Sequence, residues 1–236
     1  MRRSVEPSVR LAPAVDPFEV DAALEGIARR ATAEPVGREV WRRAFDVVGA
    51  AVLLVLTAPL SAGVALALWL AGNRPVIFWQ QRIGAGGRPF WFPKFASMQN
   101  GSYALHQRML MLSDHKNSVT FKMRDDPRVT RIGRVIRALS LDELPQLWTV
   151  LRGDMALVGP RPPLPSEVAR YDALQRRRLE VKPGLTCLWQ VHGRSLLPFD
   201  RQVVLDIEYI DNQSIWLDLA IVLRTIPAVL SCRGAF

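Results

Sequence analysis

The most prominent pattern in the sequence is an unbroken run of apolar and small residues between positions 47 and 71. This run is 25 residues long and carries no charge, whereas about 20 apolar residues are enough to cross the hydrocarbon core of a bilayer. The pattern therefore predicts a membrane-inserted helix. Pro59 lies near the middle of the run, where a proline removes one backbone hydrogen bond and kinks a helix. Thr57 and Ser61 lie close enough to help satisfy the carbonyl groups that the kink frees.

The charged residues on either side of this segment bear on its orientation. Because positively charged flanks stay on the cytoplasmic side, cations at both ends favour a helix that is kinked at Pro59, enters one leaflet and returns. The alternative is a straight single span that places residues 1–43 on the far side, and hydropathy alone does not separate the two forms. The flanking cations are Arg38, Arg42 and Arg43 before the run and Arg74, Arg82, Arg88 and Lys94 after it.

Shorter patterns in the rest of the chain predict a mixture of helices and brief strands. The expected fold class is α+β and mostly helical, with a Pro-kinked re-entrant membrane helix, amphipathic interfacial helices and a short β-sheet. We divide the chain into a flexible N-terminal tail at 1–38, the membrane helix at 39–73 and a membrane-associated catalytic domain at 74–236. The predicted strands are 76–79 and 90–95 around a glycine turn at 84–87, the predicted helices are 20–30, 101–124, 128–139, 141–151, 165–179 and two pieces within 200–230, and an extended loop at 159–163 and a turn at 182–184 connect them.

The charge of the chain is concentrated in one part of the sequence. The formal net charge is +9, and 27 of the 31 cationic residues are arginine. Positions 74–194 hold 20 cationic and nine acidic residues, whereas 1–46 is balanced at eight of each and 195–236 is slightly acidic. Arginine forks onto phosphate oxygens and stays charged when it is partly buried. The middle segment therefore favours an anionic partner, either a phosphate-bearing substrate or an anionic lipid surface.

The strongest candidate for chemistry is the segment Ser140-Leu141-Asp142-Glu143-Leu144-Pro145. One interpretation is structural, because Ser140 followed three residues later by Glu143 forms a capping box that opens the next helix, and Pro145 is tolerated near a helix start. The functional interpretation uses the same geometry, since a carboxylate in the first turn faces the positive end of the helix dipole. Arg137 lies five residues before Asp142. Both features would lower the pKa of Asp142 and keep it ionised.

An ionised, partly desolvated carboxylate can act as a nucleophile on phosphorus and form an acyl phosphate. Phosphoryl transfer also needs fixed cations or a metal to neutralise charge, and Lys94, Arg137 and Arg161 supply cations from separate contexts. Asp142 and Glu143 are hard oxygen ligands of the kind that Mg²⁺ accepts.

Other motifs give no competing chemistry. The sequence contains no P-loop, no G-x-G-x-x-G after a strand and no G-x-S-x-G. The pair Asp125-Asp126 before Pro127 is better explained as a turn than as a metal site. Cys187 is expected to pack, and His192 is expected to form a hydrogen bond within a loop. Two cysteines are too few for a disulfide framework.

Taken together, these segments resemble the bacterial sugar transferase family, the monotopic polyprenyl-phosphate glycosyl-1-phosphate transferases that initiate exopolysaccharide and O-antigen repeat units. The resemblance covers positions 41–229. It includes the Pro59 segment, Gln81-Arg82-Ile83-Gly84, Lys94-Phe95 with Met98, Asp126-Pro127-Arg128-Val129-Thr130-Arg131-Ile132-Gly133, Arg137, Ser140-Leu141-Asp142-Glu143-Leu144-Pro145-Gln146-Leu147, Gly153-Asp154-Met155-Ala156-Leu157-Val158-Gly159-Pro160-Arg161-Pro162, Lys182-Pro183-Gly184-Leu185-Thr186, Trp189-Gln190-Val191 and Gly193-Arg194.

The resemblance implies an enzyme of the bacterial inner membrane whose catalytic domain faces the cytoplasm. It would transfer a sugar-1-phosphate from a UDP-sugar to undecaprenyl phosphate, release UMP and use Mg²⁺. Asp142 would match the aspartate that forms a covalent phospho-sugar intermediate, and Glu143 would assist with proton handling and metal binding. The resemblance also implies that phosphate and substrate are bound by Lys94, Arg137, Arg161 and Arg194.

Three departures from the family pattern bear on this expectation. Ala96 stands where arginine is usual, Cys187 where glycine is frequent, and Ala58 where serine is common. The change at Ala96 would weaken a substrate contact or alter sugar choice, and none of the three removes the carboxylate pair.

One alternative function is a catalytically impaired, membrane-anchored basic scaffold that binds anionic lipid or nucleic acid. The carboxylates among the arginines argue against nucleic acid, because they repel polyphosphate. The motifs leave the sugar open among glucose, galactose and N-acetylated sugars, and they allow a homodimer.

Overall fold

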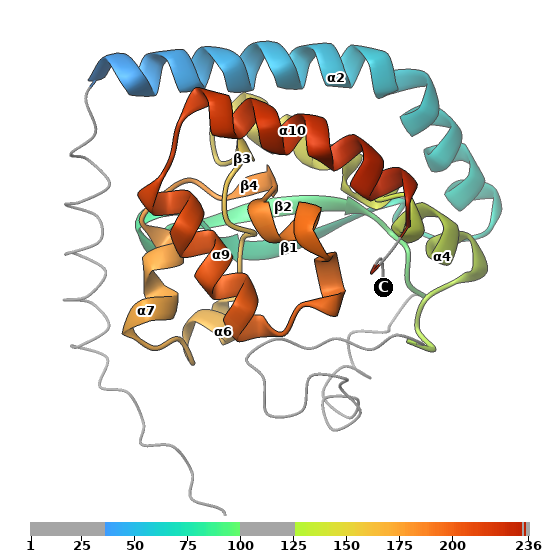
Figure 1. The fold of residues 1–236 in the computed structure, drawn as a ribbon. Coiled ribbons are helices and arrows are strands. Elements are labelled where there is room, and N and C mark those ends of the chain that lie inside the picture. Colours follow the sequence, from blue (N-terminus) through green and yellow to red (C-terminus); the bar gives the residue numbers. More distant parts are fainter. Residues whose placement is uncertain (1–35, 100–125, 233, 235–236) are drawn as a thin grey trace, which may run out of the picture.

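A computed structural model describes residues 36–99, 126–232 and 234 of the chain. Within these ranges the predicted mostly helical α+β class is confirmed. A long apolar helix, α2, lies along one side of a body made of two small sheets and short helices (Figure 1). The predicted helices at 20–30 and 101–124, and most of the predicted N-terminal tail, lie outside the described residues.

Helix α2 spans Val36–Leu70, so it begins and ends three residues earlier than the predicted membrane helix at 39–73. It is long and apolar enough to cross a membrane, and only 11% of its most apolar window is buried by the rest of the described chain. The ribbon bends in its second half (Figure 1), and Pro59 inside the helix accounts for the bend. The hydroxyl of Thr57 donates to the carbonyl of Leu53 at 2.7 Å. The expected help from Thr57 is therefore wrong in detail, because proline at 59 frees the carbonyl of Val55.

Polar side chains bind the part of α2 that precedes Pro59, here called its first arm, to the rest of the described protein, here called the body. The guanidinium of Arg42 donates to Gln213 Oε1 at 2.6 Å and to the hydroxyl of Tyr209 at 2.7 Å, and its Nε lies 3.3 Å from Asp218 Oδ2. Arg43 donates to the carbonyls of Val150 and Leu151.

One turn further along α2, Asp46 Oδ1 accepts the backbone N–H of Leu157 at 2.8 Å. Burying these charges is costly unless each has a close partner, and these partners fix the position of the first arm on the body.

Apolar side chains pack the part of α2 that follows Pro59, its second arm, against the same body. Val64 and Leu68 are buried in a cluster with Phe95 and Ile136. Both arms of the bent helix are therefore held by one body, while many of its other apolar side chains are exposed. The exposed large apolar residues of α2 include Val48, Val52, Val55, Leu56, Leu60, Leu66, Trp69 and Leu70.

The predicted hairpin after α2 is confirmed. Strand β1 (Ile77–Ile83) pairs antiparallel with β2 (Pro89–Phe95), and the glycine turn forms the 3₁₀ helix η1 (Ala85–Gly87). In this register Phe78 lies opposite Lys94 and Gln80 lies opposite Phe92. Since side chains alternate along a strand, Lys94 shares one face of the hairpin with the buried Phe92. The hairpin thus carries Lys94 towards the core.

The next two helices differ from the sequence prediction. Helix α4 spans Arg131–Ala138, starts after Thr130, whose hydroxyl accepts the N–H of Gly133 at 2.9 Å, and is shorter than the predicted 128–139. The predicted single helix 141–151 is instead the 3₁₀ helix η3 (Leu141–Gln146) followed by α5 (Leu147–Arg152). Pro145 within the first turns has no N–H to continue an α-helical ladder, which explains the irregular start.

The segment after α5 contains a small parallel sheet that the sequence did not predict. Strand β3 (Ala156–Val158) pairs with β4 (Gly184–Thr186), and β4 begins inside the expected turn at 182–184. A Cβ atom on Gly184 would lie 2.0 Å from the backbone nitrogen of Gly159. The close approach of the two strands therefore requires glycine at 184.

The predicted helix 165–179 is wrong, because the structure has three short pieces: α6 (Pro165–Val168), α7 (Ala173–Arg176) and η4 (Arg177–Leu179). The first piece ends at Val168, and Asp172 caps the second, since its carboxylate accepts the N–H of Gln175 at 2.8 Å. This capping box starts a new helix within the predicted one.

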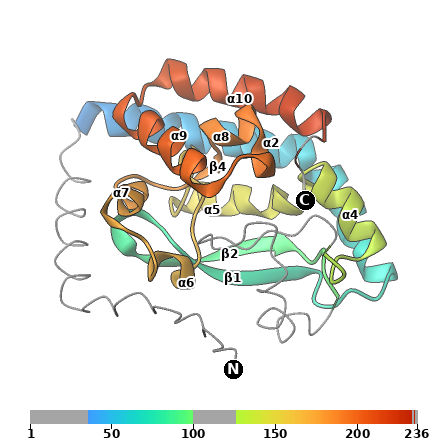
Figure 2. The same cartoon turned by 60° about the horizontal axis from the view of Figure 1, so that its bottom comes forward.

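The C-terminal part of the chain is helical, and the two helical pieces predicted within 200–230 are confirmed as its last two helices, whereas the two short helices before them were not predicted. It contains α8 (Leu188–His192), η5 (Arg194–Leu196), α9 (Phe199–Asp211) and α10 (Ile215–Leu230). Helix α10 lies alongside the first arm of α2 (Figures 1 and 2). The main core between these elements contains Phe92, Leu147, Val150, Leu157, Tyr209 and Ile221.

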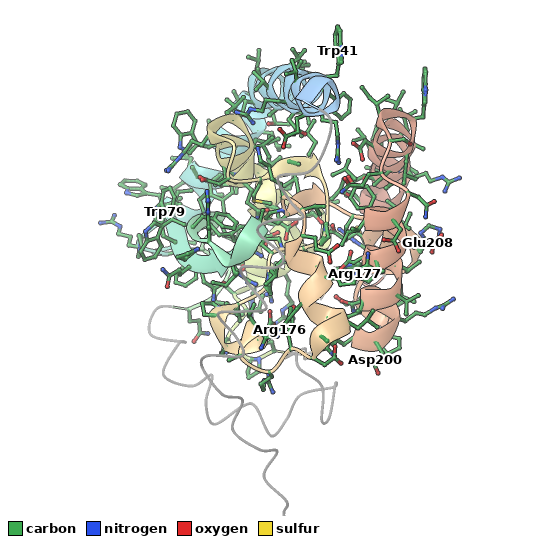
Figure 3. All side chains as sticks on the ribbon, turned by 90° about the vertical axis from the view of Figure 1, so that its left-hand side faces the viewer. Trp41, Trp79, Arg176, Arg177, Asp200 and Glu208 are labelled. Atoms are coloured by element: carbon green, nitrogen blue, oxygen red, sulfur yellow. The ribbon has the colours of Figure 1, made fainter. Side chains whose placement is uncertain are left out.

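Large apolar side chains remain on the outside of the body. Trp41 on α2 and Trp79 on β1 project outward (Figure 3), and α10 exposes Trp216, Leu223 and Ile226. Exposed indoles and an amphipathic helix are typical of proteins that rest in the headgroup layer of a membrane.

Candidate active site

Three separate segments bring charged side chains to one place. Strand β2 contributes Lys94, helix η3 contributes Asp142 and Glu143, and the loop after β3 contributes Arg161. Arg161 Nη2 donates to Glu143 Oε1 at 2.8 Å, and Lys94 Nζ lies 3.4 Å from the same oxygen. Lys94 Nζ also lies 4.0 Å from Asp142 Oδ2. The structure therefore joins four of the predicted site residues in one cluster.

The turn that presents the two carboxylates has an unusual backbone. Ser140 adopts a left-handed conformation with φ 54°, and its hydroxyl does not cap η3. Instead, the hydroxyl accepts a hydrogen bond from Arg194, which also has a positive φ of 53°. The N–H of Ser140 donates to the carbonyl of Arg137 at 2.9 Å.

The predicted capping box is therefore wrong, because Glu143 is turned away from Ser140 by its ion pairs with Arg161 and Lys94. Two non-glycine residues held at positive φ are strained, and such strain is common at functional sites.

The pKa of Asp142 differs from the prediction. The residue is only 5% exposed, and burial raises its pKa above the ordinary value of 3.8. Lys94 and Arg137 lower the pKa and Glu143 raises it, but burial is the largest influence. The expectation of a lowered pKa was wrong because the sequence did not reveal how deeply this carboxylate is buried.

The pKa values of Glu143 and Lys94 are shifted by burial, by the charge of the other residue and by the charge of Arg161. Burial alone would raise the pKa of Glu143, but Arg161 and Lys94 together lower it to about 2. Burial and the charge of Arg161 lower the pKa of Lys94 to about 8, against the opposing effect of the two carboxylates. Glu143 is thus a permanent anion, and Asp142 is the more basic of the two carboxylates.

The two remaining predicted cations lie close to the pair without touching it. Arg137 is half-buried at the end of α4, and within the described residues its guanidinium has no ion pair. Its charge acts on Asp142 through space. Arg194 contacts Ser140, and burial lowers its pKa while the charge of Glu143 raises it. Both arginines are placed where they could meet an anion bound at the cluster.

The carboxylate pair is compatible with magnesium only when other oxygen donors take part. Among the described residues there is no group of three or more His, Cys, Asp or Glu side chains that could hold a metal. Mg²⁺ commonly uses one or two carboxylates together with substrate phosphates. Asp142 suits this role better than Glu143, because one oxygen of Glu143 is already bound by Arg161 and Lys94.

Two side chains with a structural interpretation behave as expected, and a third differs. Asp126 accepts the N–H of Arg128 at 3.0 Å in a turn, whereas its neighbour Asp125 lies outside the described residues. Cys187 is buried, and its thiol donates to Gln190 Oε1 at 3.1 Å. The loop predicted around His192 is wrong, because this residue ends helix α8 and its Nδ1 lies 2.7 Å from the carbonyl of Leu188, one turn earlier in the same helix.

Sequence reasoning missed three charged residues next to the cluster, of which Arg178 and Asp206 are buried and Arg82 is half-buried. The guanidinium of Arg82 donates to the carbonyl of Pro162 at 3.0 Å, and Arg178 forms an ion pair with Asp206 at 2.8 Å. Arg82 lies in a motif of the resemblance, but no role was inferred for it. Arg178 and Asp206 are 28 positions apart, and no spacing signal connects them.

Comparison with known proteins places this geometry in a family context. Residues 37–232 match the family described as "Bacterial sugar transferase". "Exopolysaccharide production protein ExoY" of Rhizobium meliloti (strain 1021) is 39% identical over 205 residues, which are 86% of this chain and 90% of that protein.

Two further relatives are longer than this chain. "Galactosyl transferase CpsE" of Streptococcus agalactiae serotype III is 42% identical over 197 residues, 83% of this chain and 43% of that protein. "UDP-glucose:undecaprenyl-phosphate glucose-1-phosphate transferase" of Caulobacter vibrioides is 41% identical over 209 residues, 85% of this chain and 74% of that protein. The chain thus spans less than half the length of the first of these relatives.

The shifted pKa of Glu143 predicts a pH dependence of stability. Its folded-state pKa of about 2 lies below the ordinary value of 4.5, so its stabilisation is present above pH 4.5 and is lost as pH falls towards 2. The shift corresponds to at most about 3 kcal/mol. Thermal unfolding of the wild type and of Glu143→Gln, measured between pH 7 and pH 3, should show a difference in melting temperature that narrows below pH 4.5. A constant difference would contradict this assignment.

Proposed function

The chain belongs to the bacterial sugar transferase family, and from this premise we propose that it transfers a sugar-1-phosphate from a UDP-sugar to undecaprenyl phosphate and releases UMP. This reaction is the first membrane step of exopolysaccharide or O-antigen assembly. The observation that carries the proposal is that the two neighbouring carboxylates have different partners and different pKa values. Glu143 is neutralised by Arg161 and Lys94, whereas Asp142 is buried, more basic and 4.0 Å from Lys94.

The pair supports a double displacement with Asp142 as the nucleophile. An oxygen of Asp142 would attack the phosphorus that bears the sugar, and the bond from that phosphorus to the UMP oxygen would break. The acyl phosphate formed in this way holds the sugar-1-phosphate on Asp142 while UMP leaves. A phosphate oxygen of undecaprenyl phosphate would then attack the same phosphorus, and the carboxylate of Asp142 would be released unchanged. Burial makes the carboxylate more basic and hence more nucleophilic, and the charge of Lys94 opposes the rise in its pKa and favours the ionised form.

The surrounding cations support the same reaction through charge neutralisation. The transferred phosphoryl group carries negative charge on its non-bridging oxygens, and fixed cations in a desolvated site stabilise that charge. Lys94 and Arg161 already contact the carboxylates, and Arg137 and Arg194 lie next to them. We assign these four residues to phosphate and substrate binding.

We further propose Mg²⁺ as the cofactor. Asp142 and Glu143 would hold it together with oxygens of the substrate diphosphate. The ion would neutralise the charge of the departing UMP. The carboxylates themselves keep the roles given above.

The arrangement of α2 supports a re-entrant position in the bacterial inner membrane. Arg42 and Asp46 on its first arm and Val64 and Leu68 on its second arm contact the same body, whereas a straight span would hold its ends on opposite sides of the bilayer. The exposed apolar residues between the arms suit the lipid interior. We propose that the body faces the cytoplasm, where it meets soluble UDP-sugars, and that α2 brings it to the lipid acceptor.

The relatives' names differ in the sugar, galactosyl in one case and glucose in another, so we propose no particular donor. The homodimer stays a prediction. A scaffold that binds lipid or nucleic acid gains no support from a specific contact in the described residues, and we expect no nucleic-acid partner.

The reaction is tested by UMP release from detergent-purified full-length protein supplied with undecaprenyl phosphate, Mg²⁺ and a panel of UDP-sugars. We expect release with at least one donor and a loss of about 10³-fold or more in Asp142→Asn. Asp200→Asn, which changes an exposed aspartate of α9, serves as the matched control and should stay active. Absence of release from every donor by folded protein would favour the scaffold. Release that survives Asp142→Asn would contradict the covalent route but keep the enzyme class.

The position of α2 is tested by cysteine labelling in intact and lysed spheroplasts. Glu39→Cys lies before the apolar segment and Arg88→Cys lies on the hairpin, both at exposed positions. A Cys232→Ser background removes the exposed native thiol, and Cys187 is buried. A re-entrant helix predicts that a membrane-impermeant maleimide labels both sites only after lysis. Labelling of Glu39→Cys alone in intact spheroplasts would establish a single span instead.

A further inference from the structure

The loop that carries Arg161 accepts hydrogen bonds from other segments at four consecutive residues. Prolines at 160, 162, 163 and 165 leave it few N–H groups of its own, yet each carbonyl from 160 to 163 accepts a hydrogen bond from another segment. The four donors are Gly184 N–H to Pro160 at 3.0 Å, Arg178 Nη2 to Arg161 at 3.2 Å, Arg82 Nη1 to Pro162 at 3.0 Å and Ile83 N–H to Pro163 at 3.0 Å.

The donor to the carbonyl of Arg161 itself is a buried side chain. Arg178 is 5% exposed, and its ion-pair partner Asp206 is fully buried on α9. Arg178 Nε donates to Asp206 Oδ2 at 2.8 Å, and Nη1 donates to the hydroxyl of Tyr171. The rings of Tyr171 and Phe199 lie next to each other, and their centroids are 5.7 and 5.6 Å from the carbon of the guanidinium. These contacts fix the plane of the guanidinium so that its third nitrogen, Nη2, reaches Arg161.

Stability alone does not explain this pair. Removing two charges from water is costly, and a well-packed apolar pair of similar size is often equally stable or more stable. What an apolar pair cannot do is donate a hydrogen bond to the carbonyl of Arg161. Two of the three guanidinium nitrogens of Arg178 are occupied by Asp206 and Tyr171, and the remaining one is directed at the residue that binds Glu143.

We propose that Arg178, held by Asp206, is a positioning residue for Arg161 and thereby for the carboxylate pair. The contacts run from Asp206 to Arg178, from Arg178 to the carbonyl of Arg161, and from the Arg161 side chain to Glu143. The inference rests on the proposed transferase activity, in which Arg161 neutralises charge beside Asp142. A displacement of about 1 Å in such a group can cost about 10²-fold in rate.

The test replaces the pair without leaving a buried charge unpaired. In the full-length protein, Arg178→Met combined with Asp206→Leu should keep the melting temperature within a few degrees of the wild type or raise it. The same double variant should lower kcat for UMP release by about 10- to 100-fold, with a smaller change in KM for the UDP-sugar.

The matched control is the neighbouring pair, Arg177→Met with Asp211→Leu. Arg177 Nη2 lies 2.5 Å from Asp211 Oδ1 at the surface, and no contact is described between this pair and Arg161. It should leave kcat unchanged.

A double-mutant cycle separates positioning from general destabilisation. If Arg178 acts through Arg161, the Arg178→Met/Asp206→Leu change should reduce kcat by less than about threefold in an Arg161→Ala background, because the group being positioned is already gone. The proposal would be overturned if Arg178→Met/Asp206→Leu reduced kcat by the same factor with and without Arg161→Ala. A wild-type kcat in the Arg178→Met/Asp206→Leu variant would also overturn it.

Arg178→Lys provides a second measurement if the double variant does not fold. Its ammonium can pair with Asp206 but lacks the fork that also reaches Arg161, so kcat should again fall, and an unchanged kcat would overturn the proposal. UMP release by the wild type shows separately whether the transferase activity itself holds.

Discussion

The ion pairs of Glu143 are the constraint on which the rest of the site depends. One carboxylate oxygen joins Arg161 from the loop after β3 to Lys94 from β2, and so connects three segments that are far apart in the sequence. Removing this anion would leave two partly buried cations close together without their shared counter-ion, which is unfavourable. The same contacts give the two neighbouring carboxylates different properties. Glu143 remains ionised as a counter-ion, whereas Asp142, buried with only a distant partner in Lys94, is left for chemistry.

The position of this cluster relative to the membrane follows from the way α2 is attached. Arg42, Arg43 and Asp46 hold its first arm through hydrogen bonds, and Val64 and Leu68 hold its second arm through apolar packing. Helix α10 lies beside the first arm (Figure 2), and it exposes further apolar side chains. The proposed reaction needs a soluble nucleotide sugar and a lipid phosphate to meet at one site, and this attachment is consistent with a site at the membrane interface.

Features of the fold that depend on local pattern were predictable from the sequence, and features that depend on distant contacts were not. The apolar run predicted α2, and short β-like runs around a glycine turn predicted the hairpin. In contrast, the three-residue strands β3 and β4 are too short to leave a pattern, and Asp172 interrupts a segment that reads as one helix.

The site likewise has features that the sequence predicted and features that depend on distant contacts. Its residues were found through motifs, but the capping box at Ser140 and the lowered pKa of Asp142 were wrong. Both errors arise because the partners of Glu143 lie 18 and 49 positions away, and burial of Asp142 depends on how those segments pack.

The most direct test of the central claim is to locate the covalent intermediate by peptide mass spectrometry, after rapid quenching of the protein with its UDP-sugar and without lipid acceptor. The account predicts one sugar-phosphate adduct on Asp142. An adduct on Glu143 or elsewhere, or turnover with no adduct at all, would contradict it.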